Sequence, residues 1–140
     1  MNDSTTCTIP ATLDGIAAAT THAETWLAAR HADPTAGLLA SLAIEEIVTN
    51  CIKYGFEANT QHNVEVTLSL NGDNLAIVIL DDAREFNPMQ APPPNLTASI
   101  EERTIGGVGL HMLRALSDKI IYQRIANNNR LEFQKQLKPG

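Results

Sequence analysis

Aromatic side chains, cysteines and basic residues are few in this sequence, and each shortage disfavours a class of protein. Aromatic residues make up 4% of the 140 residues, which disfavours a surface that stacks nucleic-acid bases. The formal net charge is −6, whereas sequence-independent binding to nucleic acid needs clustered Lys and Arg side chains. We therefore expect no nucleic-acid partner.

Thiols and long apolar runs are also scarce. Cys7 and Cys51 are the only cysteines, and Cys51 lies in an apolar helical pattern, so we expect it to be buried rather than joined in a disulfide. No basic segment followed by an apolar one opens the sequence, and its apolar runs are far shorter than the ~20 residues of a membrane span. We expect a soluble, cytoplasmic protein without a membrane partner.

Length and composition favour one folded domain. A chain of 140 residues has the size of one domain, since domains mostly run about 100–150 residues. Hydrophobic residues make up 44% and charged residues 19%, which is the balance of a globular protein rather than a disordered one. We expect a single domain over residues 1–140 that needs neither a disulfide nor a metal to be stable.

Apolar residues recur with helical spacing in some segments and alternate with polar residues in others. The expected helices span residues 13–32, 35–54 and 110–116. Thr12 or Asp14 is expected to cap the first of them. The expected strands span residues 5–9, 64–70, 75–80, 120–125 and 130–137. Turns are expected at Asn71-Gly72-Asp73 and Asn127-Asn128-Asn129, and the strand at 75–80 is apolar enough to be buried on both faces. These elements predict a helical layer packed on a mostly antiparallel sheet.

The first of three chemically distinctive segments is Glu46-Ile47-Val48-Thr49-Asn50, inside the second expected helix. Residues four apart lie on one face of a helix, so Glu46 and Asn50 project together beside the apolar stripe. An amide oxygen suits Mg²⁺, and a carboxylate can take a proton from a hydroxyl group. Taken alone, the pair is more simply explained as two polar side chains on a solvent-exposed face of the helix.

The second segment, Asp81 to Pro88, follows the apolar strand at 75–80. A carboxylate at the end of a buried strand can accept a hydrogen bond from the exocyclic amine of a ligand. Alone, the segment is more typical of a turn that closes a strand, because Asp side chains bond to the backbone nearby. Both interpretations remain open at this point.

The third segment is Gly106-Gly107-Val108-Gly109-Leu110, which opens a helix. Glycines let the backbone approach an anion closely, and a helix N-terminus offers unbonded N–H groups. A flexible loop entering a helix is an equally good interpretation. The segment is not a P-loop, since no Gly-Lys-Ser/Thr follows, and no strand leads into it as a dinucleotide fingerprint requires.

In this order and spacing, the three segments resemble the GHKL (Bergerat-fold) ATPase and kinase superfamily, and within it the small anti-sigma-factor serine/threonine kinases. Glu46-x-x-x-Asn50 with Lys53-Tyr54-Gly55-Phe56 is similar to the N box of that family. Asp81 to Pro88 is similar to its Asp-x-Gly-x-x-Phe-Asp-Pro box, and Gly106 to Leu110 to its Gly-Gly-x-Gly-Leu box. The resemblance covers Leu13 to Leu137. It implies an α+β two-layer sandwich whose mixed, mostly antiparallel sheet is covered on one face by about three helices.

The resemblance also implies roles for individual residues. Glu46 would be the catalytic general base, Asn50 would coordinate Mg²⁺ at the ATP phosphates, and Asp81 would bind the adenine amino group. Residues 89–105 would form a lid over ATP. The other nucleotide-binding residues that the resemblance implies are Ala83, Arg103, Gly106, Gly107, Val108, Gly109 and Leu110.

The implied cofactors are ATP and Mg²⁺, and the implied partners are a STAS-type anti-sigma-factor antagonist, a sigma factor and a second copy of the chain. We expect a kinase that phosphorylates the antagonist and sequesters the sigma factor. Ala83 stands where the family usually has glycine, and Tyr54 where histidine is common, so a module that sequesters its partner without phosphoryl transfer is the alternative. A simple ATPase is a weaker third choice, because the chain is too short to hold a transducer domain.

Overall fold

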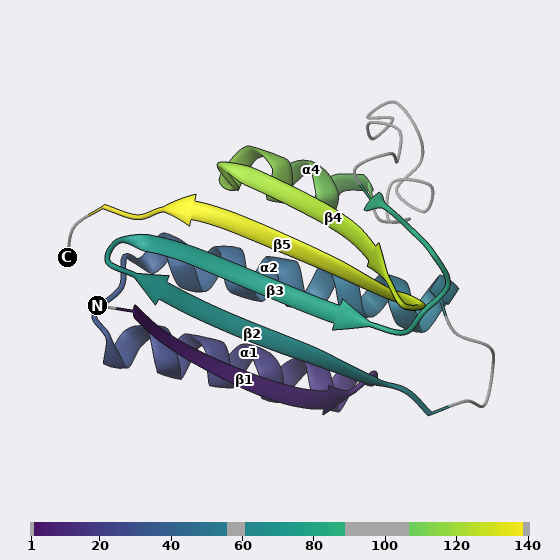
Figure 1. Ribbon diagram of the computed structural model, residues 1–140. Coiled ribbons are helices and arrows are strands. Elements are labelled where there is room, and N and C mark those ends of the chain that lie inside the picture. The colour runs from purple at the N-terminus through teal and green to yellow at the C-terminus, as the bar shows by residue number, and fades with distance from the viewer. Residues whose placement is uncertain (1, 56–60, 89–106, 139–140) are drawn as a thin grey trace.

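The structure is a computed structural model that describes residues 2–55, 61–88 and 107–138. Five strands form one sheet in the order β1-β2-β3-β5-β4, and helices α1 and α2 lie behind it (Figure 1). The strands are β1 (Asn2–Pro10), β2 (Asn63–Asn71), β3 (Asn74–Asp81), β4 (Lys119–Ile125) and β5 (Asn128–Gln136). The helices are α1 (Leu13–Ala29), α2 (Pro34–Asn50) and α4 (Gly107–Leu116), and a π-helical turn, Cys51–Gly55, continues α2.

The sheet is antiparallel at each pairing among the described residues. Along β2 the side chains of Val64, Val66 and Leu68 are buried, while the residues between them are exposed or half-buried. This alternation follows from the two-residue repeat of a strand, which turns every second side chain toward the helices. The expected α+β two-layer sandwich is confirmed, and the parallel pair that a mixed sheet allows is not found in the described part of the chain.

The core lies between the sheet and the helical layer. Its largest fully buried side chains include Phe133, Leu39, Ile44, Leu68, Leu75, Ile77, Ile79, Leu113 and Leu131. Three alanines on α2, Ala36, Ala40 and Ala43, are fully buried and let the neighbouring elements approach closely. Cys51 is buried as expected, and Cys7 and Cys51 are both free thiols.

One described helix, Pro34–Tyr54, is long and apolar enough to cross a membrane by length and composition alone, with a mean hydropathy of 1.3. The core helix of a compact domain passes the same test. Here this helix is α2 with its π-helical turn, and its buried stripe, including Leu39, Ile44 and Val48, packs in the core of the sandwich. Its apolar composition is therefore accounted for by packing inside the domain.

The first helix ends three residues before the expected boundary, at Ala29 rather than residue 32. His31 adopts a left-handed conformation with φ of 56°. Its N–H donates to the carbonyl of Ala28, and the N–H of Ala32 donates to the carbonyl of Leu27. This bonding pattern is a common way to end a helix, but glycine usually occupies the left-handed position. At the other end Thr12, not Asp14, is the cap, because its hydroxyl accepts the N–H of Gly15 at 3.0 Å.

The strand hairpins differ from expectation at one turn. The β2–β3 turn is where Asn71-Gly72-Asp73 predicts it, with Gly72 at φ of 62°. The β4–β5 turn was expected at residues 127–129, but its left-handed residues are Ala126 and Asn127, at φ of 48° and 69°. The prediction was therefore displaced toward the C-terminus, and Asn129 belongs to strand β5, where it pairs with Asp81.

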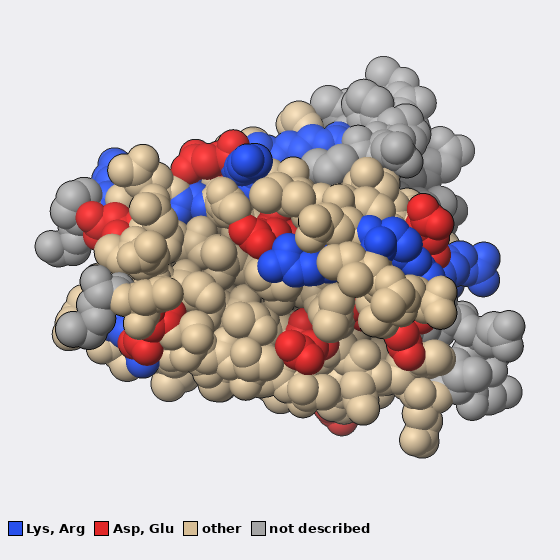
Figure 2. Space-filling model, in the orientation of Figure 1, with Lys and Arg blue, Asp and Glu red and all other residues tan. Residues whose placement is uncertain are grey.

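The face of the sheet that points away from α1 and α2 is uncovered, which contradicts the expectation that β3 is buried on both faces. Leu75, Ile77 and Ile79 are buried toward the helices, but the alternate residues Ala76 and Val78 are only partly buried. Figure 2 shows this outer face, where uncharged surface over the middle strands is interrupted by acidic and basic groups. The apolar character of β3 therefore serves the core on one side and an open surface on the other.

Candidate functional site

The described parts of the three distinctive segments meet at one end of the molecule. α2 ends at Asn50, β3 ends at Asp81 and α4 begins at Gly107, and these ends lie at the same edge of the sandwich (Figure 1). α2 packs directly against both β3 and α4. The fold therefore brings together residues that lie far apart in the sequence.

Glu46 and Asn50 occupy the last turn of α2 and share one face, as their spacing predicts. The Asn50 amide nitrogen donates to Oε1 of Glu46 across 3.5 Å, and both side chains are partly exposed. That bond uses the amide nitrogen of Asn50 and leaves its carbonyl oxygen, the atom suited to Mg²⁺, outside the bond.

Partial burial gives Glu46 the character of a stronger base. Desolvation raises the pKa of its carboxyl group, because burial disfavours the charged form, while the hydrogen bond from Asn50 and the charge of Lys53 oppose that shift. A carboxylate with a raised pKa accepts a proton more readily than an exposed one. The π-helical turn that follows carries Lys53, and such turns are frequent at functional sites.

Asp81 is a buried carboxylate at the end of β3, only 4% exposed. Its Oδ1 accepts hydrogen bonds from the Ala83 N–H at 3.0 Å and from the Asn129 side-chain amide at 2.9 Å. Neither bond uses Oδ2, although the Cys51 thiol also forms a hydrogen bond with this carboxylate. The pKa of the Cys51 thiol is raised by burial and by the neighbouring Asp81 carboxylate. The structure therefore holds a fixed hydrogen-bond acceptor next to the end of α2.

Ala83 fits its position without the conformational freedom of glycine. It is not among the described residues with positive φ, which apart from glycine are His31, Ala126 and Asn127. Its methyl group is buried, its N–H bonds to Asp81, and its carbonyl accepts the Arg124 guanidinium at 2.8 Å. The alanine therefore costs the loop no backbone strain, although the family pattern has glycine there.

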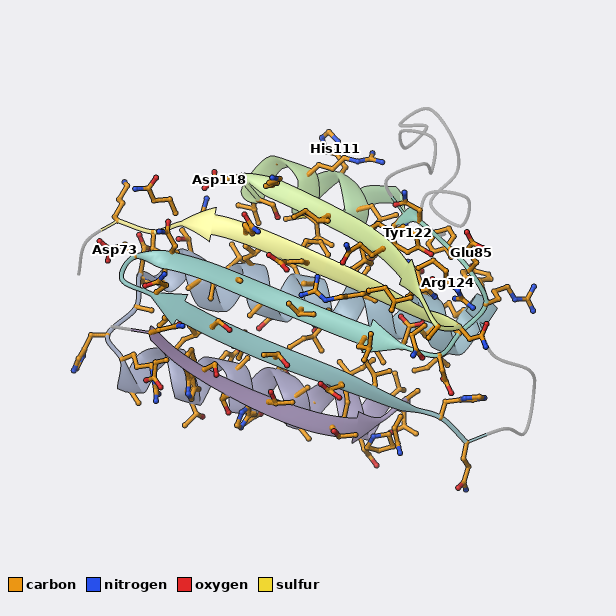
Figure 3. All side chains as sticks on the ribbon, in the orientation of Figure 1. Asp73, Glu85, His111, Asp118, Tyr122 and Arg124 are labelled. Carbon is orange, nitrogen blue, oxygen red and sulfur yellow. The ribbon has the colours of Figure 1, made fainter. Side chains whose placement is uncertain are left out.

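Asn129 is the residue of this site that the sequence analysis missed. Its amide nitrogen donates to Asp81 and to the Arg84 carbonyl, each at 2.9 Å. Its carbonyl oxygen accepts from three donors, the Tyr122 hydroxyl at 2.6 Å, the Arg124 guanidinium at 3.1 Å and the Phe86 N–H at 3.2 Å. Figure 3 shows Tyr122 and Arg124 at this end of the sheet. One buried amide thus ties β5 and β4 to the loop after β3.

The signal that identifies Asn129 depends on the position of the β4–β5 turn. With Ala126 and Asn127 in the turn, the inward positions of β5 are Asn129, Leu131 and Phe133. A polar residue in an otherwise apolar inward set, 3% exposed, indicates a buried hydrogen-bonding role. Interpreted as a turn residue, the same asparagine carries no such signal.

The glycine segment is described only in part. Arg103, Gly106 and the expected lid at residues 89–105 lie outside the described residues. Gly107 and Val108 open α4, Gly109 lies in its first turn, and Leu110 is 3% exposed and packs in the core. Farther along α4, Arg114 donates to the Pro88 carbonyl at 3.3 Å. α4 therefore also anchors the far end of the segment that starts at Asp81.

The donor set at the end of α2 fits a magnesium ion that is held mainly by phosphate groups. Among the described residues, no cluster of three or more His, Cys, Asp or Glu side chains could hold a metal by itself. Mg²⁺ commonly takes one or two protein oxygens and completes its shell with water and substrate phosphates. The carbonyl oxygen of Asn50 and the nearby carboxylate of Glu46 offer that limited set.

Comparisons with known proteins agree with the fold and the motif order. The family model described as the histidine kinase-like ATPase domain matches residues 9–135. The chain is 25% identical over 99 residues to the serine/threonine-protein kinase BtrW of Bordetella bronchiseptica, covering 71% of this chain and 70% of that one. It is 28% identical over 91 residues to anti-sigma F factors of two Thermoanaerobacter strains, covering 63% of this chain and 62% of each of those.

A solved structure shares the fold across nearly the whole chain. The structure of the RsbU and RsbW domains of Rv1364c from Mycobacterium tuberculosis matches with a TM-score of 0.68 at 19% identity. The match covers 99% of this chain and 33% of the Mycobacterium chain. At this identity the likeness concerns the fold alone, and the chain spans about a third of the length of the Mycobacterium protein.

Proposed function

The chain belongs to the histidine kinase-like ATPase domain family, and on that premise we propose that it is an ATP-dependent serine/threonine protein kinase that acts as an anti-sigma factor. Its substrate would be a serine or threonine hydroxyl on a STAS-type antagonist, and its sequestered partner a sigma factor in the cytoplasm. The names of the relatives, a serine/threonine-protein kinase and anti-sigma F factors, support this reading.

The observation that carries the proposal is the Glu46–Asn50 pair beside the buried Asp81 carboxylate. Phosphoryl transfer needs a positioned nucleotide, a metal ligand and a group that accepts the proton of the attacking hydroxyl. Asp81 would accept a hydrogen bond from the adenine amine, and Asn50 would hold Mg²⁺ through its carbonyl oxygen. Glu46 would take the hydroxyl proton onto a carboxylate oxygen. Bound Mg·ATP would supply the phosphoryl group and the charge that neutralises the phosphates.

The direct test is transfer of label from ATP to a STAS-domain antagonist. Glu46→Gln removes the proton acceptor but keeps the carbonyl oxygen that Asn50 reaches, so the rate is expected to fall about 10²–10⁴-fold. Glu45→Gln is the matched control, because Glu45 is the neighbouring residue and is exposed. It should transfer label at close to the wild-type rate. Equal rates in Glu46→Gln and wild type would exclude Glu46 as the base.

The second candidate is a regulatory module that sequesters its partner without phosphoryl transfer. The buried Ala83 methyl group, at the position where the family has glycine, is the observation that favours it. This module would bind its sigma factor as tightly as the kinase would, but no label would reach the antagonist with any variant. Binding of the sigma factor together with absent transfer would therefore select this candidate.

We infer in addition that two copies of the chain associate through the open sheet face. Ala76, Val78 and Leu80 of β3 form an apolar row that no described element covers. These side chains are half-buried, so the row offers a partly exposed apolar strip, and the association itself is what the family resemblance implies. Sedimentation should show a dimer that Val78→Glu dissociates, and a wild-type monomer at high protein concentration would contradict the inference.

A further inference from the structure

The first turn of α4 carries a glycine whose missing side chain is replaced by a carboxylate from another helix. A Cβ built on Gly109 would lie 2.6 Å from Cδ of Glu46 and 3.2 Å from its Oε1, and closer still to Oε2. These three atoms, all of one carboxylate, are the nearest heavy atoms to that position outside the neighbouring backbone of α4 itself. Because real Cβ atoms essentially never come within 3.0 Å of another heavy atom, an alanine at 109 and this placement of Glu46 exclude each other.

Neither helix has room to retreat from such a clash. On α4, Leu110 and Leu113 are 3% and 0% exposed, and on α2, Ile47 and Val48 are 4% and 0% exposed. Protein interiors are close-packed, so shifting either helix would disturb the core on both sides. The end of the Glu46 side chain is partly exposed and flexible by comparison. A Cβ at position 109 would therefore displace the carboxylate rather than the helices.

The kind of crowding differs from one glycine to another: a Cβ at Gly15 would also clash, but with the backbone carbonyl of Pro10, whereas at Gly109 the neighbour is a side-chain carboxylate. Gly37 lies inside α2, yet a Cβ there would meet only Cγ of Glu24, at 4.0 Å, which is ordinary contact. Glycine is less favourable than alanine within a helix, so a helical glycine with no space constraint can be replaced with a gain in stability. Gly37 is thus a matched control, and Gly109 is the position where the absence of a side chain makes room for a functional group.

We propose that Gly109 is a positioning residue for Glu46, because the space left by its missing Cβ is where the carboxylate sits. This inference rests on the proposed function, in which Glu46 accepts the proton of the attacking hydroxyl. It differs from the contact with phosphate that the glycine segment was expected to make through its backbone. The glycine segment then determines where the base is placed, and α2 and α4 hold the carboxylate from two sides.

The first test measures stability and needs neither ATP nor a protein substrate. Gly37→Ala should raise the Tm by about 3–5 °C in any background, from helix propensity alone. Gly109→Ala should give less than that gain in the wild type, because the new methyl group must displace the carboxylate. In the Glu46→Ala background, Gly109→Ala should raise the Tm more than it does in the wild type, because no carboxylate then has to be displaced. Equal shifts for Gly109→Ala with and without Glu46 would overturn the proposal.

The second test measures phosphoryl transfer. Gly109→Ala should lower kcat about 10- to 100-fold, the effect of misplacing a catalytic group by about 1 Å, with the KM for ATP close to wild type. Glu46→Asp withdraws the carboxylate by one methylene, so Gly109→Ala should cost less in that background than in the wild type. A rise in the KM for ATP of the same size in all backgrounds would instead indicate a phosphate contact and overturn the proposal.

The two tests separate the inference from the proposed function. If wild-type protein transfers no label while the Tm shifts depend on Glu46 as described, the packing is right and the kinase assignment fails. If wild-type protein transfers label but the Tm shifts are independent of Glu46, the kinase assignment stands and the positioning role of Gly109 is wrong.

Discussion

Two polar residues of the candidate site, Glu46 and Asn129, lie in different surroundings and have different roles. Glu46 is half-buried and its pKa is raised, so it has the character of a base, whereas Asn129 is fully buried and acts through its hydrogen bonds. The spacing of Glu46 from Asn50 could be interpreted from the sequence because helical geometry fixes it. The contacts of Asn129 could not, because they depend on strand register.

The pH dependence of phosphoryl transfer tests the environment of Glu46. A base must be ionised, so the rate should rise with pH through the raised pKa of Glu46. Lys53 lowers that pKa, and Lys53→Met should move the rise to higher pH without a comparable change in the plateau rate. Lys119→Met, on the exposed start of β4, is the control. Superimposable pH profiles for Lys53→Met and wild type would contradict this account of the Glu46 environment.

The same pKa shift has a consequence for stability. A folded-state pKa above the unfolded value means that the folded protein holds the proton more tightly, so this group's contribution to stability falls as pH rises through that pKa. At pH 7 the ionised, partly desolvated carboxylate therefore lowers the free energy of unfolding. Glu46→Gln should accordingly be no less stable than wild type at pH 7, and a lower Tm would contradict the raised pKa.

The Asn129 hydrogen bonds predict a loss of both stability and base selectivity. Asn129→Ala would remove one hydrogen bond from the buried Asp81 carboxylate and the side-chain partners of the part-buried Arg84 carbonyl and Phe86 N–H, at a cost of about 2–3 kcal/mol. Tyr122→Phe removes a single donor, and should cost about 1 kcal/mol. In both variants the preference for ATP over inosine triphosphate, which lacks the amine, should decrease. Asn128→Ala is the matched control, and an unchanged preference in Asn129→Ala would show that Asn129 does not hold Asp81 in place.

At the scale of helices and strands, local signals predict some boundaries and miss others. The β2–β3 hairpin follows from alternating apolar residues and a turn containing Gly72. The start of β1 was missed because its first residues are polar, and its pairing with β2 supplies what its side chains do not. The β4–β5 turn was displaced because Ala126, with φ of 48°, gives no signal for a left-handed conformation.

The two N-terminal helix caps predict different pH responses. Asp33 caps α2 through the Thr35 N–H, and this bond lowers its pKa below the ordinary 3.8. The ionised Asp33 side chain therefore stabilises the folded protein at neutral pH. This stabilisation is lost as the pH falls from the ordinary pKa of an Asp side chain to the lowered pKa of Asp33. Asp33→Ala should be destabilising at pH 7, and its deficit should shrink in acid.

Thr12 is the uncharged comparison for this cap. Thr12→Ala should cost about 1 kcal/mol of unfolding free energy at every pH, since the hydroxyl does not titrate. Denaturant unfolding of both variants at several pH values measures the difference. A deficit for Asp33→Ala that stays constant into acid would contradict the cap and its lowered pKa.

At the scale of the whole molecule, the sequence predicted the layers but not the way in which the site is held together. The spacing of apolar residues and the residues typical of turns were sufficient to predict a helical layer on an antiparallel sheet. That Glu46, Asp81 and Gly109 converge was implied by a family resemblance rather than by composition or periodicity. The packing of the Glu46 carboxylate against Gly109 and the hydrogen bonds of Asn129 became visible only with the tertiary arrangement.

The central claim is that nucleotide binds where α2, β3 and α4 meet, and calorimetric titration with Mg·ATP tests it most directly. We expect wild-type protein to bind with a Kd below about 1 mM, within the usual range of enzyme affinities, and to bind more weakly without Mg²⁺. Asp81→Asn should weaken binding at least about tenfold, the loss of one charged hydrogen bond, while Asp82→Asn, at the exposed neighbouring carboxylate, should bind normally. No heat up to several millimolar ATP, or equal affinity in Asp81→Asn and wild type, would contradict the account.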